Sequence, residues 1–304
     1  MAMTEHEPSI ESTDATSTTT SATVVDEATA ALAQLQCVEA SEDVARKTTT
    51  PAAAHQLTED LPFSVYSPSI RTMWSEPDAD QVLVRGSTYL DDQVKVAAGP
   101  SLGKLLHVDV WSAETPEARH HIARFDHKRD QSVLRYCEEK HPESLVFILN
   151  IELPDADNVS LVSYWLLPNF FSAANTSDSN FSRLLRTFYE ADNSWCDNRF
   201  KLIPSFVNAP WLLSQLVPSR PALTGLRLTQ HYHRADNYFE LDLDVSSSTT
   251  ARYIGSLCQS WSMYVEMDVF LTVQGETEDE LPEQVFAGLR FSYLDLSLAT
   301  TIRE

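Results

Sequence analysis

The chain has 304 residues, a formal net charge of −22 at pH 7 and 43% hydrophobic residues. That length and apolar content accommodate one large domain, or two small ones, plus tails. The acidic balance excludes nucleic acid as a partner, because binding to phosphates requires clustered Lys and Arg side chains. Constitutive adhesion to anionic membranes is disfavoured for the same reason, unless a local basic patch is present.

The first 60 residues differ in composition from the rest of the chain. They hold 11 Asp and Glu against 2 Lys and Arg, they are rich in Ser and Thr, and they contain no aromatic residue. Such a segment cannot bury enough apolar surface to offset its conformational entropy. We therefore predict a disordered acidic tail over residues 1–60 and a folded domain over residues 61–304.

The spacing of the cysteines and the lengths of the apolar runs indicate the cellular compartment of the protein. Cys37, Cys137, Cys196 and Cys258 are far apart, so they form no zinc or redox motif. No apolar run approaches the roughly 20 residues that a membrane span requires, and none follows Met1 as a signal peptide would. We expect a cytoplasmic protein without a transmembrane segment, peripheral on endomembranes at most.

In the first half of the chain, apolar patterning predicts strands over residues 81–90 and 105–112, a helix over 116–140, and paired strands over 145–153 and 159–167. A short helix over 181–189 and a hairpin of strands over 226–233 and 239–246 are expected next. A helix over 249–265 and closing strands over 267–275 and 286–302 complete the predicted elements. Strands and helices in blocks are typical of an α+β domain. We predict a largely antiparallel β-sheet with helices packed on one face, and we consider an apolar cavity between them.

The strand over residues 239–246 is the most clearly amphipathic element. Its apolar side chains alternate with Glu240, Asp242 and Asp244, which are expected on the opposite face. Carboxylates in this arrangement are suitable ligands for a hard cation, but no calcium-loop pattern surrounds them. We interpret this acidic face as solvent-exposed.

No motif indicates catalysis or a complete metal site. His231 and His233 share a strand face, but the sequence indicates no third zinc ligand. The chain has only seven glycines and lacks both a nucleophile elbow and a phosphate-binding loop. We predict no catalytic residue, no metal, no cofactor and no enzyme activity, and we rank an uncharted hydrolase last.

Short motifs spread over about residues 70–300 resemble, in order, those of the Enhanced Disease Resistance 2 C-terminal domain family. They are VRGSTYLDDQVK (84–95), HVDVW (107–111), NIELP (150–154), RFKLIP (199–204), NAPW (208–211), NYFELDLDVSSS (237–248) and LPEQVFAGLR (281–290). Two positions depart from the family pattern: Ala209 stands where Gly is usual, and Gln274 where Glu is common.

The resemblance implies a membrane-associated or lipid-related regulatory role, with no established catalysis for the domain itself. In plants this domain is often joined to lipid-binding pleckstrin-homology and START modules. We expect neither here, because 60 to 70 polar residues cannot form one, so the lipid binding of those modules is not implied for this chain.

Four cationic residues lie inside the family-like motifs among apolar neighbours: Arg85, Lys95, Lys201 and Arg290. Buried cations need partners. One interpretation is ion pairing with Asp109, Asp268 or Glu283, which we favour because it requires no unseen ligand. The other is a headgroup site at the mouth of an apolar cavity lined by Phe206, Trp211 and Trp261.

Our leading hypothesis is a non-enzymatic lipid-binding or membrane-trafficking regulatory protein. Its ligand would lie in an apolar pocket capped by the helix over residues 249–265, with six candidate ligand-binding residues: Arg85, Lys95, Lys201, Phe206, Trp211 and Trp261. The alternative is a protein-interaction module without a ligand pocket, which recruits protein partners through the acidic strand face and the tail.

Overall fold

The computed structural model describes residues 70–154, 158–172, 179–217 and 220–302. The predicted tail over residues 1–60 and the turn residues Asp155 and Asp157 lie outside these ranges. Within the described part, no helix is long and apolar enough to cross a bilayer.

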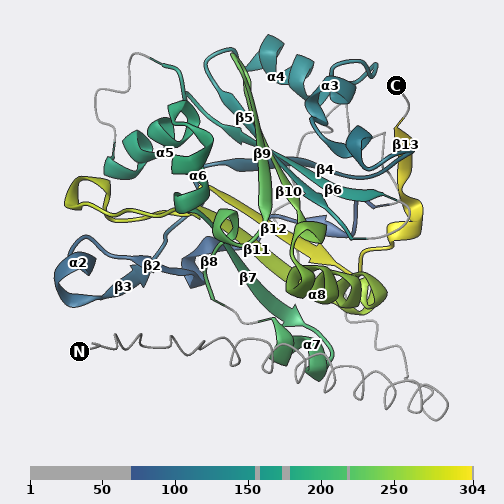
Figure 1. Cartoon of the computed structure of the whole chain (residues 1–304). Helices are drawn as coiled ribbons and strands as arrows, with labels where there is room; N and C mark the ends of the chain where they lie inside the picture. Colours follow the sequence, from purple (N-terminus) through teal and green to yellow (C-terminus); the bar gives the residue numbers. More distant parts are fainter. Residues whose placement is uncertain (1–69, 155–157, 173–178, 218–219, 303–304) are drawn as a thin grey trace, which may run out of the picture. The chain divides into compact units, whose positions relative to one another are not determined.

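Two β-sheets form the centre of the domain (Figure 1). One sheet has the strand order β1 (Trp74–Ser75), β12 (Ala287–Ser292), β11 (Glu266–Val273), β7 (Phe200–Asn208) and β8 (Ala222–Leu223). The other has the order β13 (Thr300–Ile302), β4 (Lys104–Ala113), β6 (Val159–Leu167), β5 (Leu145–Glu152), β10 (Tyr238–Asp244) and β9 (Thr229–Ala235). Neighbouring strands are antiparallel except for β10 with β5 and β13 with β4.

The inner faces of the two sheets pack against each other and form the main core. Leu271 and Leu289 of the five-stranded sheet belong to the same buried cluster as Phe147 and Leu241 of the six-stranded sheet. Fully burying side chains of this size stabilises a fold by about 1.5–3 kcal/mol each. The core therefore explains why alternate residues along β5, β10 and β11 are apolar.

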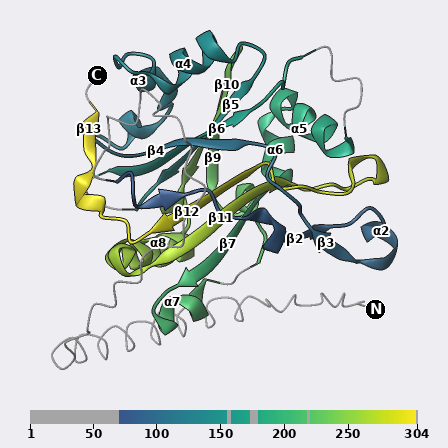
Figure 2. The same ribbon diagram turned by 180° about the vertical axis from the view of Figure 1, so that it is seen from behind.

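Helices cover the outer face of the six-stranded sheet. Ile122, Phe125 and Leu134, from the segment that contains α3 (Ala123–Asp126) and α4 (Val133–Lys140), pack on Ile148 and Tyr164. Both views show these two helices together on that side of the domain, away from the five-stranded sheet (Figures 1 and 2).

The remaining helices lie at the margins of the two sheets. The helices α5 (Asn180–Glu190) and α6 (Asn193–Arg199) contribute Phe181, Phe188 and Cys196 to the inter-sheet core. Two further helices, α7 (Trp211–Leu216) and α8 (Thr249–Ser260), contact each other.

A small hairpin covers the outer face of the five-stranded sheet. It pairs β2 (Leu83–Arg85) with β3 (Lys95–Ala97), and its tip carries the one-turn helix α2 (Tyr89–Asp92). Val84 from this hairpin packs against Ile203 of β7 and Phe270 of β11. The hairpin is thereby held beside the beginning of β7.

The predicted α+β class and largely antiparallel sheets are confirmed, while four expectations are wrong in detail. The closing strand expected over 286–302 is divided into β12 and β13, which belong to different sheets and are separated by the 3-10 helix η8 (Leu296–Leu298). The strand expected over 81–90 is only Leu83–Arg85, because the chain turns into α2. The helix expected over 116–140 is divided into the 3-10 helix η3 (Glu117–Arg119), α3 and α4. The helix expected over 249–265 ends at Ser260 and is followed by the 3-10 helix η6 (Ser262–Tyr264).

The prediction that the acidic face of β10 is solvent-exposed is also wrong. Glu240 and Asp242 are fully buried. The reason is tertiary: β10 lies between β5 and β9, and the segment before α3 covers this face. The Glu240 carboxylate accepts hydrogen bonds from the backbone N–H groups of Ile122 and Ala123.

The inter-sheet contact generates a stability prediction. Trp165 of β6 is fully buried, and its Nε1–H donates to the carbonyl oxygen of Gly288 on β12, at 2.9 Å. Trp165→Phe removes this hydrogen bond and leaves a void, so we expect a loss of about 2 kcal/mol in the free energy of unfolding, measured by urea denaturation. The matched control Trp211→Phe, at a position 76% exposed, should change it by less than about 0.5 kcal/mol. Equal effects would contradict the assignment of Trp165 to the sheet interface.

Candidate functional site: a cationic cleft

A cleft of about 600 Å³ opens between the β2–β3 hairpin, the beginning of β7 and residues 220–227. We call it the cationic cleft. Its lining residues are Leu83, Val84, Arg85, Tyr89, Lys95, Lys201, Ile203, Arg220, Pro221, Ala222, Leu223, Leu226, Arg227, Gln274 and Glu283. This volume lies in the range of small-molecule sites in proteins.

The charges that line the cleft oppose the charge of the whole chain. Five side chains are cationic, and Glu283 is the one carboxylate in the lining. The formal charge of the lining is therefore positive, in a protein whose formal net charge is −22. An anionic ligand is the natural complement of this arrangement.

Strand geometry brings three of these cations together. Lys201 and Ile203 alternate with Phe200 and Leu202 along β7, so Lys201 faces away from the inter-sheet core. Arg85 and Lys95 are directly paired across the hairpin. Like charges directly opposite each other in a sheet are destabilising, so a neighbouring anion is required.

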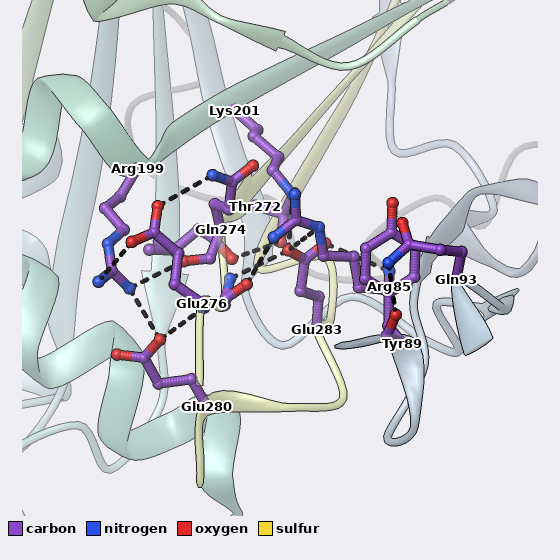
Figure 3. Close-up of polar contacts among 12 residues, drawn as sticks. Arg85, Tyr89, Gln93, Arg199, Lys201, Thr272, Gln274, Glu276, Glu280 and Glu283 are labelled. Carbon is purple, nitrogen blue, oxygen red and sulfur yellow. Dashed lines mark hydrogen bonds and ion pairs between the residues drawn. The ribbon is translucent and has the colours of Figure 1, made fainter. Parts of the chain in front are cut away.

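Glu283 supplies this negative charge (Figure 3). Its Oε1 accepts from Lys201 Nζ at 2.6 Å and from the backbone N–H of Gly275 at 3.0 Å. Arg85 Nε lies 3.7 Å from the same oxygen, and the backbone N–H of Arg85 donates to Oε2. A single buried carboxylate therefore links the hairpin, β7 and the loop before β12.

A second ion-pair group positions the loop that carries Glu283. Arg199, at the end of α6, donates to Glu280 Oε2 at 2.8 Å and lies 3.1 Å from Glu276 Oε2 (Figure 3). The backbone N–H groups of Glu276 and Thr277 also donate to Glu280. The loop is thus fixed to the end of α6, next to Lys201.

The ion pairs expected from the sequence are confirmed in two cases. Glu283 is the partner of Arg85 and Lys201, and Asp268 is the partner of Arg290, at 2.6 Å. Asp109 was the third expected acceptor, but it pairs instead with Arg129 and His107. Both partners of Asp109 lie on the side of the six-stranded sheet, remote from the four candidate cations.

Glu283 does not neutralise the cluster completely. Burial lowers the pKa of Lys201 to about 8, and the attraction of Glu283 is partly offset by repulsion from Arg85 and Lys95. Lys201 therefore lies in an environment where further negative charge is favourable. An anion bound in the cleft would raise this pKa again.

Three cations of the cleft are available to a ligand. Lys95, Arg220 and Arg227 are exposed, and none forms an ion pair with a carboxylate of the described residues. Arg220 and Arg227 were not singled out from the sequence, because they flank the two-residue strand β8, in a stretch after α7 whose path depends on tertiary packing. Only their positive charge was visible beforehand.

Exposed apolar side chains accompany these charges. Leu83 and Leu226 line the cleft with 59% and 56% of their surface exposed, and Val94 and Val96 of the hairpin are exposed as well. Exposed apolar side chains beside cationic ones are typical of a site that contacts an amphipathic ligand.

The three aromatic candidates lie elsewhere. Phe206 is half-buried near the far end of β7, Trp211 is exposed at the start of α7, and Trp261 is half-buried after α8. Phe206 differs from Lys201 by an odd number of strand positions, which places it on the opposite face. Among the described residues, Arg85, Lys95 and Lys201 thus share one cleft, and the aromatic three do not line it.

The apolar cavity expected beneath the helix over residues 249–265 is not shown. A second hollow, of about 160 Å³, lies beside α5 and is lined in part by Leu102, Phe170 and Leu185. Neither this hollow nor the cationic cleft is lined by a residue of α8. The inter-sheet space is occupied by side chains, for example Phe147 against Phe286 with ring centroids 5.1 Å apart.

Comparison with known proteins agrees with this picture of one domain. A family model described as "Protein ENHANCED DISEASE RESISTANCE 2, C-terminal" matches residues 74–295, a range that contains every residue of the cleft. A relative from Arabidopsis thaliana, "Protein ENHANCED DISEASE RESISTANCE 2-like", is 29% identical over 229 residues, which are 75% of this chain and 30% of the relative. The chain thus matches less than a third of that relative's length.

No solved structure is significantly similar to the chain. On the strength of the match over residues 74–295, the chain belongs to the Enhanced Disease Resistance 2 C-terminal domain family.

Proposed function

We propose that this protein is a non-enzymatic lipid-binding regulator that binds the anionic headgroup of a membrane phospholipid in the cationic cleft. The main support for this proposal is that five cationic side chains and only one carboxylate line the cleft of a strongly acidic protein. Phosphate groups attract Arg through paired N–H donors and Lys through a compact charge, and the cleft offers both.

The lining of the cleft supports a lipid rather than a free inorganic anion. About half of the lining residues are apolar, and the exposed Leu83 and Leu226 are among them. In a complex, we expect phosphate oxygens to contact Lys95, Arg220 and Arg227, while the aliphatic side chains contact the glycerol and acyl region. This division follows from the polarity of a phospholipid.

Non-enzymatic action is part of the proposal. Burial raises the pKa of Cys137 to about 12 and the pKa of Cys196 to about 11. These thiols are therefore protonated at neutral pH, which makes them poor nucleophiles. Neither of them lines the cationic cleft.

One observation favours the alternative, a protein-interaction module. Trp211, Met263 and Tyr264 are 76%, 56% and 64% exposed, and they lie on α7 and just after α8, which contact each other. Exposed aromatic and Met side chains are enriched in protein interfaces. If this alternative holds, the protein does not bind anionic vesicles, and substitutions in the cationic cleft do not affect its association with partners.

Neutralising the available cations is the first test of the cleft. Lys95→Ala and Arg227→Ala should each weaken binding to vesicles of phosphatidylcholine with a small fraction of phosphatidylinositol phosphate by about fivefold, because each basic side chain contributes about 1 kcal/mol near an anionic surface. The measurement is co-flotation with vesicles at low salt.

Lys128→Ala is the matched control, since Lys128 is an exposed Lys on the other sheet's side, after α3. It should bind vesicles like the wild type, and all three variants should keep the wild-type unfolding temperature. Lys201 is unsuitable for this comparison, because its removal leaves the buried Glu283 without its nearest cation and destabilises the fold. Wild-type binding by both Lys95→Ala and Arg227→Ala would refute the proposal.

The lowered pKa of Lys201 predicts a pH dependence. Lys201 is protonated below about pH 8 and loses its charge as the pH rises through that value, so lipid affinity should fall between pH 7 and pH 9.5. Because the bound anion itself raises this pKa, the fall should begin at or above pH 8. Phosphate monoesters are fully charged in this range and do not produce a loss.

Lys201→Arg tests the assignment of this titration. Arg stays protonated at these pH values, so vesicle binding by this variant should be flat from pH 7 to pH 9.5. Binding is measured with the same vesicles by co-flotation across the pH series. An identical fall in both proteins would show that another group is responsible.

A further inference from the structure

A buried polar cluster lies on the outer face of the six-stranded sheet, remote in the fold from the cationic cleft. Strand register places Asn150 of β5, Asp242 of β10 and His231 of β9 side by side. Glu152 follows Asn150 on the same face of β5. His120, directly after η3, packs over these side chains, and its ring is hydrogen-bonded to Glu152.

Three side chains of the cluster present ligand atoms to a common point. A ring nitrogen of His120 and carboxylate oxygens of Glu152 and Asp242 all lie within 4.8 Å of one another. His120 Nδ1 is 2.6 Å from Glu152 Oε1. Ligands of a tetrahedral Zn²⁺ ion at about 2.0–2.2 Å are roughly 3.4 Å apart, so small side-chain rotations are sufficient to close this set around a metal.

The burial of the two carboxylates points to a missing positive charge. Glu152 and Asp242 are both fully buried, and Glu152 Oε2 has no hydrogen-bond partner among the described residues. Buried carboxylate oxygens are almost always paired, coordinated or hydrogen-bonded.

Arg119 provides the nearest permanent positive charge, but it does not form an ion pair with Glu152. Its Nη1 instead donates to the carbonyl oxygen of Leu153 at 2.7 Å. Within the described ranges, no Arg or Lys nitrogen lies within ion-pair distance of Glu152 or Asp242. The point between the two carboxylates and His120 is therefore not occupied by a cationic side chain.

Neighbouring groups hold the Asp242 carboxylate through hydrogen bonds. In metal sites, residues around the ligands hold them in the same way. Asn150 Nδ2 donates to Oδ1 at 2.9 Å, and His233 Nε2 lies 2.9 Å from Oδ2. The backbone N–H of His121 also donates to Oδ2, at 3.0 Å. Such hydrogen bonds fix a carboxylate in one orientation and tune its strength as a ligand.

We propose that His120, Glu152 and Asp242 bind a divalent transition metal ion of the Zn²⁺ class. Imidazole together with carboxylate favours such ions over Ca²⁺ and Mg²⁺, which prefer oxygen ligands alone. Water or His231, whose ring centroid is 4.8 Å from that of His120, completes the coordination. The ion would attach the segment before α3 to β5 and β10, which makes the site structural.

This site was not expected from the sequence, which indicated no third ligand for His231 and His233. His120 and Glu152 are 32 residues apart, and Glu152 and Asp242 are brought together only by the parallel pairing of β5 with β10. The proposal is independent of the cationic cleft, because the two sites share no residue.

The test uses the full chain after treatment with a chelator, titrated with Zn²⁺ against a chromophoric competitor. We expect one tight equivalent in the wild type, and at least tenfold weaker binding in His120→Gln and in Glu152→Gln, since even outer residues of metal sites contribute tenfold or more. Zn²⁺ should also raise the unfolding temperature of the wild type and not that of the two variants. Replacement with Co²⁺ should produce visible d–d absorption in the wild type alone.

His141→Gln is the matched control, because His141 follows α4 and contributes no atom to the cluster. It should retain the tight equivalent. His120 is the safest position for the test, since its side chain is 35% exposed and its loss leaves the sheet intact. Absence of a tight equivalent in the wild type, or its persistence in folded His120→Gln, would overturn the proposal.

Discussion

The contact between the inner faces of the two sheets determines which side chains every central strand presents outward. Phe147, Trp165, Leu271 and Phe286 are buried in this contact, so the intervening residues of each strand must face the opposite way. On β7 the outward set contains Lys201, and on β10 it contains Glu240 and Asp242. A slip of one residue in either strand would exchange the two sets, and both candidate sites would be lost.

The two outward faces are then covered differently, and this difference decides their chemistry. A short hairpin lies over the five-stranded sheet and leaves a cleft, so Lys95, Arg220 and Arg227 remain accessible to an anion from solution. The segment containing α3 and α4 covers the six-stranded sheet more completely, so the acids of β10 are buried and bonded to backbone N–H groups. On these two faces, therefore, Lys95, Arg220 and Arg227 are accessible, whereas Glu240 and Asp242 are buried.

Glu283 is the carboxylate on which the geometry of the cationic cleft depends. It neutralises Lys201 and Arg85, which stabilises the hairpin on β7, but one carboxylate cannot balance all the cations around it. Burial lowers the pKa of Lys201 to about 8, and repulsion from Arg85 and Lys95 acts in the same direction.

The sequence by itself determined the α+β class, most strand positions, the pairing of β5 with β6 and of β9 with β10, the family and two of the ion-pair partners. These features depend on local periodicity, on turn residues and on short motifs that can be recognised without tertiary contacts.

The remaining features were decided by tertiary packing. The burial of Glu240 and Asp242 follows from the helical segment packed over them. The addition of Arg220 and Arg227 to the cleft follows from the path of the segment that contains β8. His120, Glu152 and Asp242 come together because β5 and β10 pair in parallel. The paired residues Asn150 and Asp242 of these strands are 92 residues apart in the sequence. Alternation along a strand is a local property, whereas what covers each face is a long-range one, and here the covering elements decide which charges are available to a ligand.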